Sequence, residues 1–197
     1  MATIKDGERG EVARVDKNNR LAVRSVNTED DKTATINADS YNINTGLVTL
    51  TTAGESGVLY VKNNETRDLF VRTIVAVLGP TTGGSATDTT QVRIYKNPTT
   101  GTLISGATAV DINSNRNFGS SKTLTVDAYK GAEGNTITNG SSHIESLISP
   151  GNRVSFPIDE VLTKGDSIAV SYEPNDSNTS MKTMTALICH LQNSNEA

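Results

Sequence analysis

Short runs of apolar residues, separated by polar turn residues, recur along the chain from Tyr41 to its end. The strongest run, Asp68–Leu78, is almost continuously apolar in its second half, which is typical of a strand in the middle of a sheet. In Met181–Leu191 the positions alternate with period two and both faces are fairly apolar, so this strand is also predicted to be central. No long segment shows the 3.6-residue apolar period of an amphipathic helix. The pattern therefore predicts an all-β fold.

Further short strands are predicted at Leu47–Thr52, Val58–Lys62, Val92–Tyr95, Leu103–Ile104, Val110–Ile112, Ile144–Ile148, Val154–Phe156, Ile158–Leu162 and Ser167–Tyr172. Pro80 is expected to end the Asp68–Leu78 strand, because proline cannot donate to a central ladder. Residues 113–142 are dense in Asn, Ser and Gly, and we expect a long loop excursion there. About 8–10 strands with a central C-terminal strand favour a jelly-roll-like β-sandwich over a meander.

Residues 1–45 differ from residues 46–197, which we expect to form the β-sandwich domain. The first twenty residues are charged and poor in large apolar side chains, and Leu21–Val26 then alternates apolar and polar positions. We interpret 1–45 as an extended N-terminal arm with short strands that docks on a partner or a neighbouring subunit by strand addition. The predicted partner-binding residues are Val12, Arg14, Val15, Arg20, Leu21, Val23, Arg24 and Val26. A frayed terminus followed by an edge strand is the simpler alternative.

The amino-acid composition and net charge exclude some classes of function for this chain. Hydrophobic residues make up 35% of the 197 residues and aromatic residues only 4%, whereas Thr, Asn, Ser and Gly, which favour strands and turns, are abundant. The net charge of -4 argues against a nucleic-acid partner. No apolar stretch reaches membrane-spanning length, and the N-terminus shows no apolar signal-peptide region. We therefore expect no membrane association.

Candidate chemistry is sparse, and we expect no cofactor, no metal and no enzymatic activity. Asp111–Asn115 begins like a calcium loop, but Arg116 and Lys122 occupy the places that need Gly and Glu. The neighbours Cys189 and His190 point to opposite faces of a strand, so they cannot form a nucleophile–base pair. The single cysteine is therefore expected to be a buried core residue. The sequence contains no Gly-x-Ser-x-Gly elbow. A depolymerase or esterase remains the enzyme alternative.

Several segments together resemble structural proteins of tailed bacteriophages, and the similarity extends over most of the chain. The segments are residues 15–26, 41–46, 56–64, 78–84, 117–124, 128–134 and 186–190, which read VDKNNRLAVRSV, YNINTG, SGVLYVKNN, LGPTTGG, NFGSSKTL, AYKGAEG and ALICH. None of these strings is a catalytic signature, so the resemblance rests on their combination.

The resemblance implies a virion protein assembled in the host cytoplasm, and specifically a head decoration (cement) protein that binds the outside of the capsid and stabilises it. Proteins of this kind are commonly homotrimers, and the implied partner is the major capsid protein or another virion protein. The alternative is a tail- or fibre-associated β-sandwich that binds a receptor or glycan, with the 113–142 excursion and the 79–90 loop lining the site. The absence of repeats and heptads favours the head accessory over a fibre.

Overall fold

The computed structural model divides the chain into two compact units, residues 1–30 and 31–197. It describes residues 4–5, 12–13, 30–51, 54–82, 89–110, 115–175 and 180–192. In the first unit, β1 (Ile4–Lys5) pairs antiparallel with β2 (Val12–Ala13). The second unit opens with the short helix α1 (Asp30–Ile36), and two sheets follow it.

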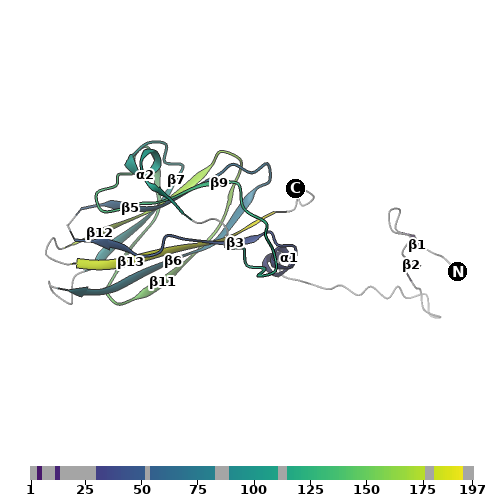
Figure 1. The fold of residues 1–197 in the computed structure, drawn as a ribbon, viewed down its shortest axis with the longest axis horizontal. Coiled ribbons are helices and arrows are strands. Elements are labelled where there is room, and N and C mark those ends of the chain that lie inside the picture. The colour runs from purple at the N-terminus through teal and green to yellow at the C-terminus, as the bar shows by residue number, and fades with distance from the viewer. Residues whose placement is uncertain are drawn as a thin grey trace. The chain divides into compact units, whose positions relative to one another are not determined.

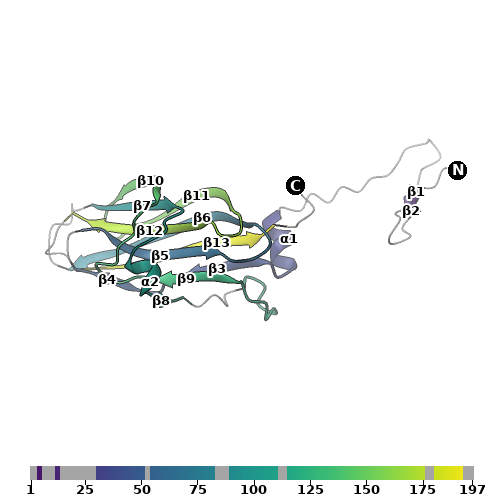
Figure 2. The same ribbon diagram turned by 90° about the horizontal axis from the view of Figure 1, so that it is seen from above.

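The second unit is a β-sandwich of two antiparallel sheets, which Figure 1 shows as two layers. The six-stranded sheet contains, in spatial order, β10 (Ser141–Ile148), β7 (Thr90–Lys96), β12 (Ser167–Pro174), β5 (Ser56–Asn63), β9 (Val126–Lys130) and β8 (Thr108–Ala109). The five-stranded sheet contains β11 (Arg153–Leu162), β6 (Leu69–Thr82), β13 (Ser180–Leu191) and β3 (Ser40–Asn44), with β4 (Val48–Leu50) on the other half of β13. Figure 2 shows the strand order from above.

Strand pairing is nested: β5 pairs with β12, β6 with β11, and β7 with β10. Folding a long antiparallel ribbon over on itself produces this order, which is the arrangement of a jelly roll. The prediction of an all-β, jelly-roll-like sandwich is therefore confirmed. The described residues form eleven strands in the two sheets, slightly more than expected. Two of them, β4 and β8, are very short.

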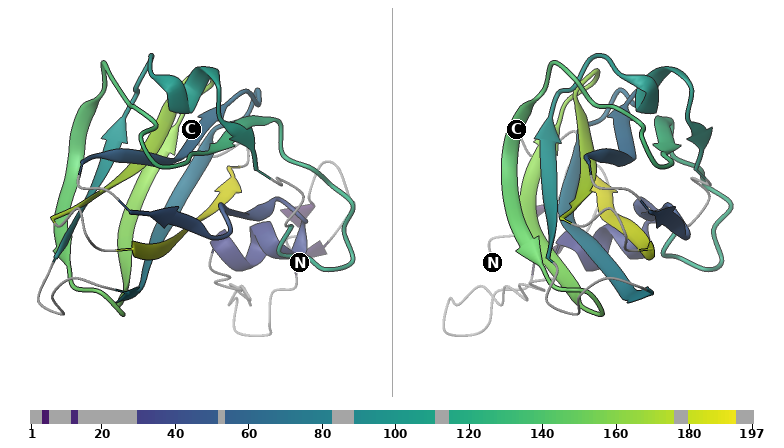
Figure 3. Two further views of the ribbon diagram at one scale, coloured as in Figure 1. Left: turned by 60° about the vertical axis from the view of Figure 1, so that its left-hand side comes forward. Right: turned by 90° about the vertical axis from the view of Figure 1, so that its left-hand side faces the viewer.

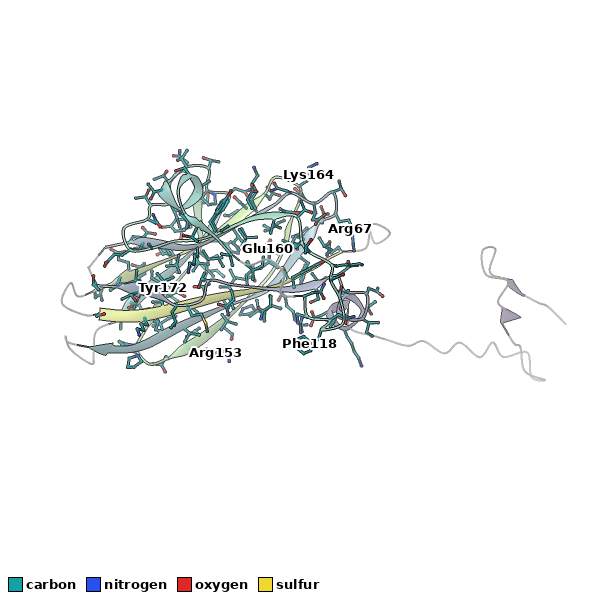
Figure 4. The ribbon with its side chains drawn as sticks, in the orientation of Figure 1. Arg67, Phe118, Arg153, Glu160, Lys164 and Tyr172 are labelled. Atoms are coloured by element: carbon teal, nitrogen blue, oxygen red, sulfur yellow. The ribbon has the colours of Figure 1, made fainter. Side chains whose placement is uncertain are left out.

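The core lies between the sheets and is filled by alternate residues of each strand. In β13 the period-two alternation separates two faces, and the inward one carries Met181, Thr183, Thr185, Leu187, Cys189 and Leu191, which are all buried. β13 is also central, between β6 and the β3–β4 edge. Across the core, the Tyr172 hydroxyl of β12 lies 2.7 Å from the Thr185 hydroxyl of β13. This pair satisfies two buried polar groups where the sheets face each other (Figure 4).

The sequence-based domain boundary at residue 45 is wrong, because the sandwich starts at Asp31. β3 belongs to the five-stranded sheet, where Ile43 faces Leu187 of β13. Tyr41 and Ile43 are buried in the core although polar residues surround them in sequence. Burial of these two side chains and pairing with β13 hold this Asn-rich segment in the sheet, so it is not part of an arm.

Pro80 does not end its strand, since β6 continues to Thr82. β11 pairs with β6 only as far as Val77, so β11 has no ladder hydrogen bond to form with Pro80. On the β13 side the register shifts between Met181 and Thr183, which accommodates the missing N–H. The proline therefore lies at a bulge beyond the central part of the sheet.

Two other local predictions differ from the structure. The predicted strand Leu103–Ile104 is part of the short helix α2 (Thr102–Ser105), whose Leu103 packs on the outer face of the six-stranded sheet with Tyr60 and Ala169. Figure 3 shows α2 on that face. The two short strands at 154–162 are one strand, β11, interrupted by a bulge at Ile158–Asp159, where Asp159 has a φ of 49°.

Within the 113–142 excursion, β9 is a strand of the six-stranded sheet. Two isolated bridges, Asn115 with Tyr41 and Thr138 with Thr100, and further backbone hydrogen bonds to β3, β5 and α2 attach the rest of the described excursion to the sandwich.

Candidate functional site

The sequence-predicted docking residues lie in the first unit. Of these residues, Val12 lies in β2 and faces Lys5 of β1. Arg14, Val15, Arg20, Leu21, Val23, Arg24 and Val26 fall outside the described residues. Strand addition by this segment stays a prediction. The described surface of the sandwich carries two further clusters of charged side chains, one at α1 and one on the six-stranded sheet.

The first surface, here called the cationic cap, consists of α1 and residues 115–122 with the charged side chains around them. Asp31 of α1 binds two arginines: its Oδ2 lies 2.7 Å from Arg72 Nη1, and its Oδ1 lies 2.5 Å from Arg116 Nη1. Arg116 also donates to the Ser40 hydroxyl at 3.1 Å. These bonds join the helix, β3, β6 and the loop into one charged unit.

A second carboxylate of the cap, Asp39, also has two cationic partners. Its Oδ2 lies 3.2 Å from Arg67 Nη1, and its Oδ1 lies 3.3 Å from Lys122 Nζ. Four cations thus share the carboxylates of Asp31 and Asp39, which leaves two positive charges in excess. The Asp39 side chain is only 11% exposed whereas that of Lys122 is 57% exposed, so the cap presents mainly its positive groups to the outside.

Phe118 is held at the tip of the cap by a closely bonded loop. Asn115 is buried, and its Nδ2 donates to the Ala38 carbonyl at 2.8 Å while its Oδ1 accepts from Asn117 N–H at 2.9 Å. Asn117 then donates through Nδ2 to the Ile36 carbonyl at 3.1 Å and accepts from Gly119 N–H at 3.1 Å. The loop around Phe118 is therefore ordered before any partner binds.

Two large apolar side chains of the cap face outward. Phe118 is fully exposed, at 101% of its reference area, and Ile36 at the end of α1 is 65% exposed. Figure 4 places Phe118 beside α1, at the end of the sandwich. Aromatic residues held in this way are typical anchors of protein interfaces, because they bury a large area at little entropic cost.

The second surface, here called the acidic patch, surrounds Arg93 on the outer face of the six-stranded sheet. Val92 and Ile94 point into the core, so Arg93 between them points outward. Its Nη1 lies 2.5 Å from Glu173 and 3.3 Å from Glu55, and its Nε lies 3.8 Å from Glu145. Three carboxylates share one guanidinium, which leaves two negative charges in excess.

Burial and the charged groups around Arg93 shift the pKa values of side chains within the acidic patch. Burial alone would lower the pKa of Arg93, but the hydrogen bond that Arg93 donates to Glu173 and the charge of Glu55 raise it. Burial and the 2.5 Å bond to Glu55 raise the pKa of Tyr95 to about 12. Beside the patch, Leu147 of β10 is 64% exposed and lies two residues from Glu145 on the same face.

The single cysteine and the adjacent histidine both lie in the interior of the sandwich. Cys189 is fully buried, and burial raises the pKa of its thiol to about 12, so it is not a reactive thiolate at neutral pH. The prediction that Cys189 packs in the core is confirmed. The adjacent His190 is also buried, and its ring lies 5.0 Å from that of Phe70. Neither side chain reaches the surface, where a substrate would bind.

The described part of the chain includes a small cavity and a larger open cleft. The small cavity of about 30 Å³ lies under β11, with His143 Nε2 3.7 Å from Glu160 Oε1 at its lining. The larger open cleft of about 360 Å³ lies between β4 and β8, lined by residues 47–49, 106–108, 130–132 and 135. The titratable pair His143 and Glu160 lines the small cavity, whereas Lys130 is the one titratable side chain among the described residues that line the cleft.

The described ranges hold no group of three or more His, Cys, Asp or Glu that could bind a metal ion. Residues 111–114 of the calcium-like loop fall outside those ranges. No described helix is long and apolar enough to span a bilayer.

Comparison with known proteins adds little to this picture. No family model matches the chain, and no curated protein matches it in sequence. Among solved structures, it is similar to the crystal structure of the Yersinia pseudotuberculosis-derived mitogen, with 12% identity over 80% of this chain and 89% of that chain, at a TM-score of 0.32. The assignment of the fold therefore rests on the strand topology described above.

Proposed function

We propose that this protein is a non-enzymatic structural component of a tailed-phage virion: a decoration (cement) protein that binds the outside of the head and stabilises it. The virion assignment rests on the resemblance of the segments named above. What supports a binding role in the structure is the division of the chain into a β-sandwich and a separate N-terminal unit. A rigid sandwich with a separate docking segment can bind a shell without a large flat interface.

The N-terminal segment is the proposed contact with the major capsid protein or another virion protein. Leu21 and Val23 alternate with Ala22 and Arg24, so one side of an added strand would be apolar. In strand addition, backbone hydrogen bonds supply affinity and alternate side chains fill pockets on the partner. Burial of two such side chains favours binding by about 3–5 kcal/mol before the entropic cost of ordering is subtracted.

A pelleting experiment with particles stripped of accessory proteins tests this contact. Val23→Asp places a charge on the apolar side of the strand and is expected to abolish co-pelleting, whereas the matched control Ala22→Asp points the other way and retains it. A variant lacking residues 12–26 is expected to lose binding while its circular dichroism still shows a folded sandwich. Normal binding by this truncated variant would exclude the segment as the contact.

One observation favours the second candidate, a tail- or fibre-associated module that binds a receptor or glycan. The cleft between β4 and β8 is large, open and lined in part by residues of the 113–142 excursion. No aromatic side chain lines it to stack on a sugar ring. A glycan array with clear hits, lost on Thr108→Trp within the cleft, would favour this candidate over head decoration.

A further inference from the structure

We infer that copies of this chain associate head to tail, with the cationic cap of one copy on the acidic patch of the next. The key residue is Phe118, which enters the interface beside Leu147 of the neighbouring copy. This goes beyond the proposed function, because it names the self-association surfaces, and it does not depend on where in a virion the protein resides.

Charge complementarity carries the inference. The cationic cap has two positive charges in excess and the acidic patch has two negative charges in excess. The cap is positive although the whole chain carries a net charge of -4, so its charge is a local feature and not a reflection of composition. Opposed surfaces of this kind steer encounter and fix the relative orientation of the partners.

Apolar groups lie within both charged surfaces. Phe118 and Ile36 stand out from the cap, and Leu147 stands out next to Glu145 in the patch. A fully exposed phenylalanine on an ordered loop contributes little to the stability of a monomer. Burial of the same side chain at the centre of an interface contributes strongly to affinity. Leu147 lies opposite Gln91 across β10 and β7, and the Gln91 amide donates to Glu145, so Leu147 is an apolar contact point directly beside the charged groups.

The two surfaces are different parts of the same copy, so the contact is heterologous and each copy can use both. Such a contact either closes into a ring or grows into a filament. In a closed ring, every cap is covered by a patch. The resemblance to phage head decoration proteins implies that this ring is a trimer. The first test is therefore the mass of the full-length protein in solution.

Light scattering and sedimentation of purified full-length protein measure this mass at low and at high salt. We expect a single oligomer at low salt that weakens as salt screens the charges. Phe118→Ser and Glu145→Lys are expected to weaken association on the order of 30-fold or more. Leu47→Ser removes another exposed apolar side chain that lies outside both surfaces, and it is expected to leave association unchanged.

Mixing the variants distinguishes a heterologous contact from a symmetric one. Phe118→Ser keeps an intact patch and Glu145→Lys keeps an intact cap, so an equimolar mixture can form one productive contact per pair. A 1:1 dimer with no further growth is the expected result. A wild-type monomer at every soluble concentration would overturn the inference, as would association of Phe118→Ser that equals wild type. Loss of particle binding alone in Phe118→Ser, with unchanged self-association, would also overturn it and assign the cap to another virion protein.

Discussion

The side chain of Asn115 donates a hydrogen bond to the carbonyl of Ala38 at 2.8 Å, and this bond fastens the loop that carries Phe118 to the end of α1. Ala38 adopts a φ of 60°, so the chain turns sharply from the helix into β3 at this point. The buried amide of Asn115 thus links the entry of the sandwich to the proposed interface.

Replacing Asn115 by Ala should destabilise the sandwich, because Asn117 N–H would lose its acceptor and the Ala38 carbonyl would keep only the longer bond from the Tyr41 hydroxyl. We expect a cost of about 2 kcal/mol in the free energy of unfolding, measured by urea denaturation. Asn152, whose amide is exposed and bonds within its own turn, is the matched control, with Asn152→Ala within about 0.5 kcal/mol of wild type. Equal midpoints for the two variants would show that the Asn115 bond is dispensable.

Gly131 is required where the end of β9 approaches β5. A Cβ at Gly131 would lie 1.8 Å from the Gly57 carbonyl oxygen, a clash with backbone that no rotamer relieves. Gly131→Ala is expected to cost about 2 kcal/mol or more. At Gly119 the nearest atom to an added Cβ is 3.6 Å away, so Gly119→Ala should be close to neutral in thermal unfolding. A neutral Gly131→Ala would contradict this packing of β9 on β5.

The Cys189 thiol should be inert in the folded protein. Because burial raises its pKa to about 12, the reactive thiolate is almost absent at pH 8, and reagent cannot reach the sulfur. A disulfide reagent that releases a coloured thiol should react only after urea unfolds the chain. Reaction of the native protein at the rate of the unfolded one would place Cys189 at the surface.

Stability should fall at high pH in part because of Tyr95. Its phenol ionises near pH 10 in the unfolded chain and near 12 in the folded one, so the folded state holds this proton more tightly. The associated stability is complete below pH 10 and is lost as the pH rises from 10 to 12. Tyr95→Phe should therefore show a shallower loss than wild type in denaturation curves across this range. Identical slopes would mean that burial and the bond to Glu55 do not raise the pKa of the phenol.

The strand pattern of the sandwich could be predicted from sequence because period-two burial is a local signal. Met181–Leu191 and Asp68–Leu78 were placed correctly as central strands on this basis. The start of the domain could not be predicted, because β3 has only two apolar side chains and its ladder partner lies 144 residues away at Leu187. The prediction for Pro80 is wrong because β6 bulges at the proline itself, where Gly79 and Pro80 face the single residue Lys182 of β13.

The two docking surfaces were also beyond sequence reasoning, for a physical reason. Their charges come from segments far apart in the chain, such as Glu55, Glu145 and Glu173 around Arg93, and only the sheet brings them together. Phe118 carried the one local signal: a lone aromatic residue within a run of Asn, Gly and Ser has no core to join. Such a residue in a polar loop is a reason to look for a binding role.

Deletion of residues 1–26 should leave the sandwich folded, because the second unit begins at Asp31 and contains all of its own core. We expect thermal unfolding of the truncated protein within about 2–4 °C of wild type, a change equivalent to about 1 kcal/mol or less. Differential scanning calorimetry of both proteins measures it. Loss of the cooperative transition would mean that the N-terminal unit is part of the folded core.

Binding to heads stripped of accessory proteins tests the proposed decoration role most directly. Full-length protein should co-pellet with the particles, saturate at a fixed ratio to the capsid subunit, and raise the temperature at which the heads release their DNA. A protein that stays in the supernatant at saturating concentration and leaves the release temperature unchanged would contradict a role in decorating and stabilising the head.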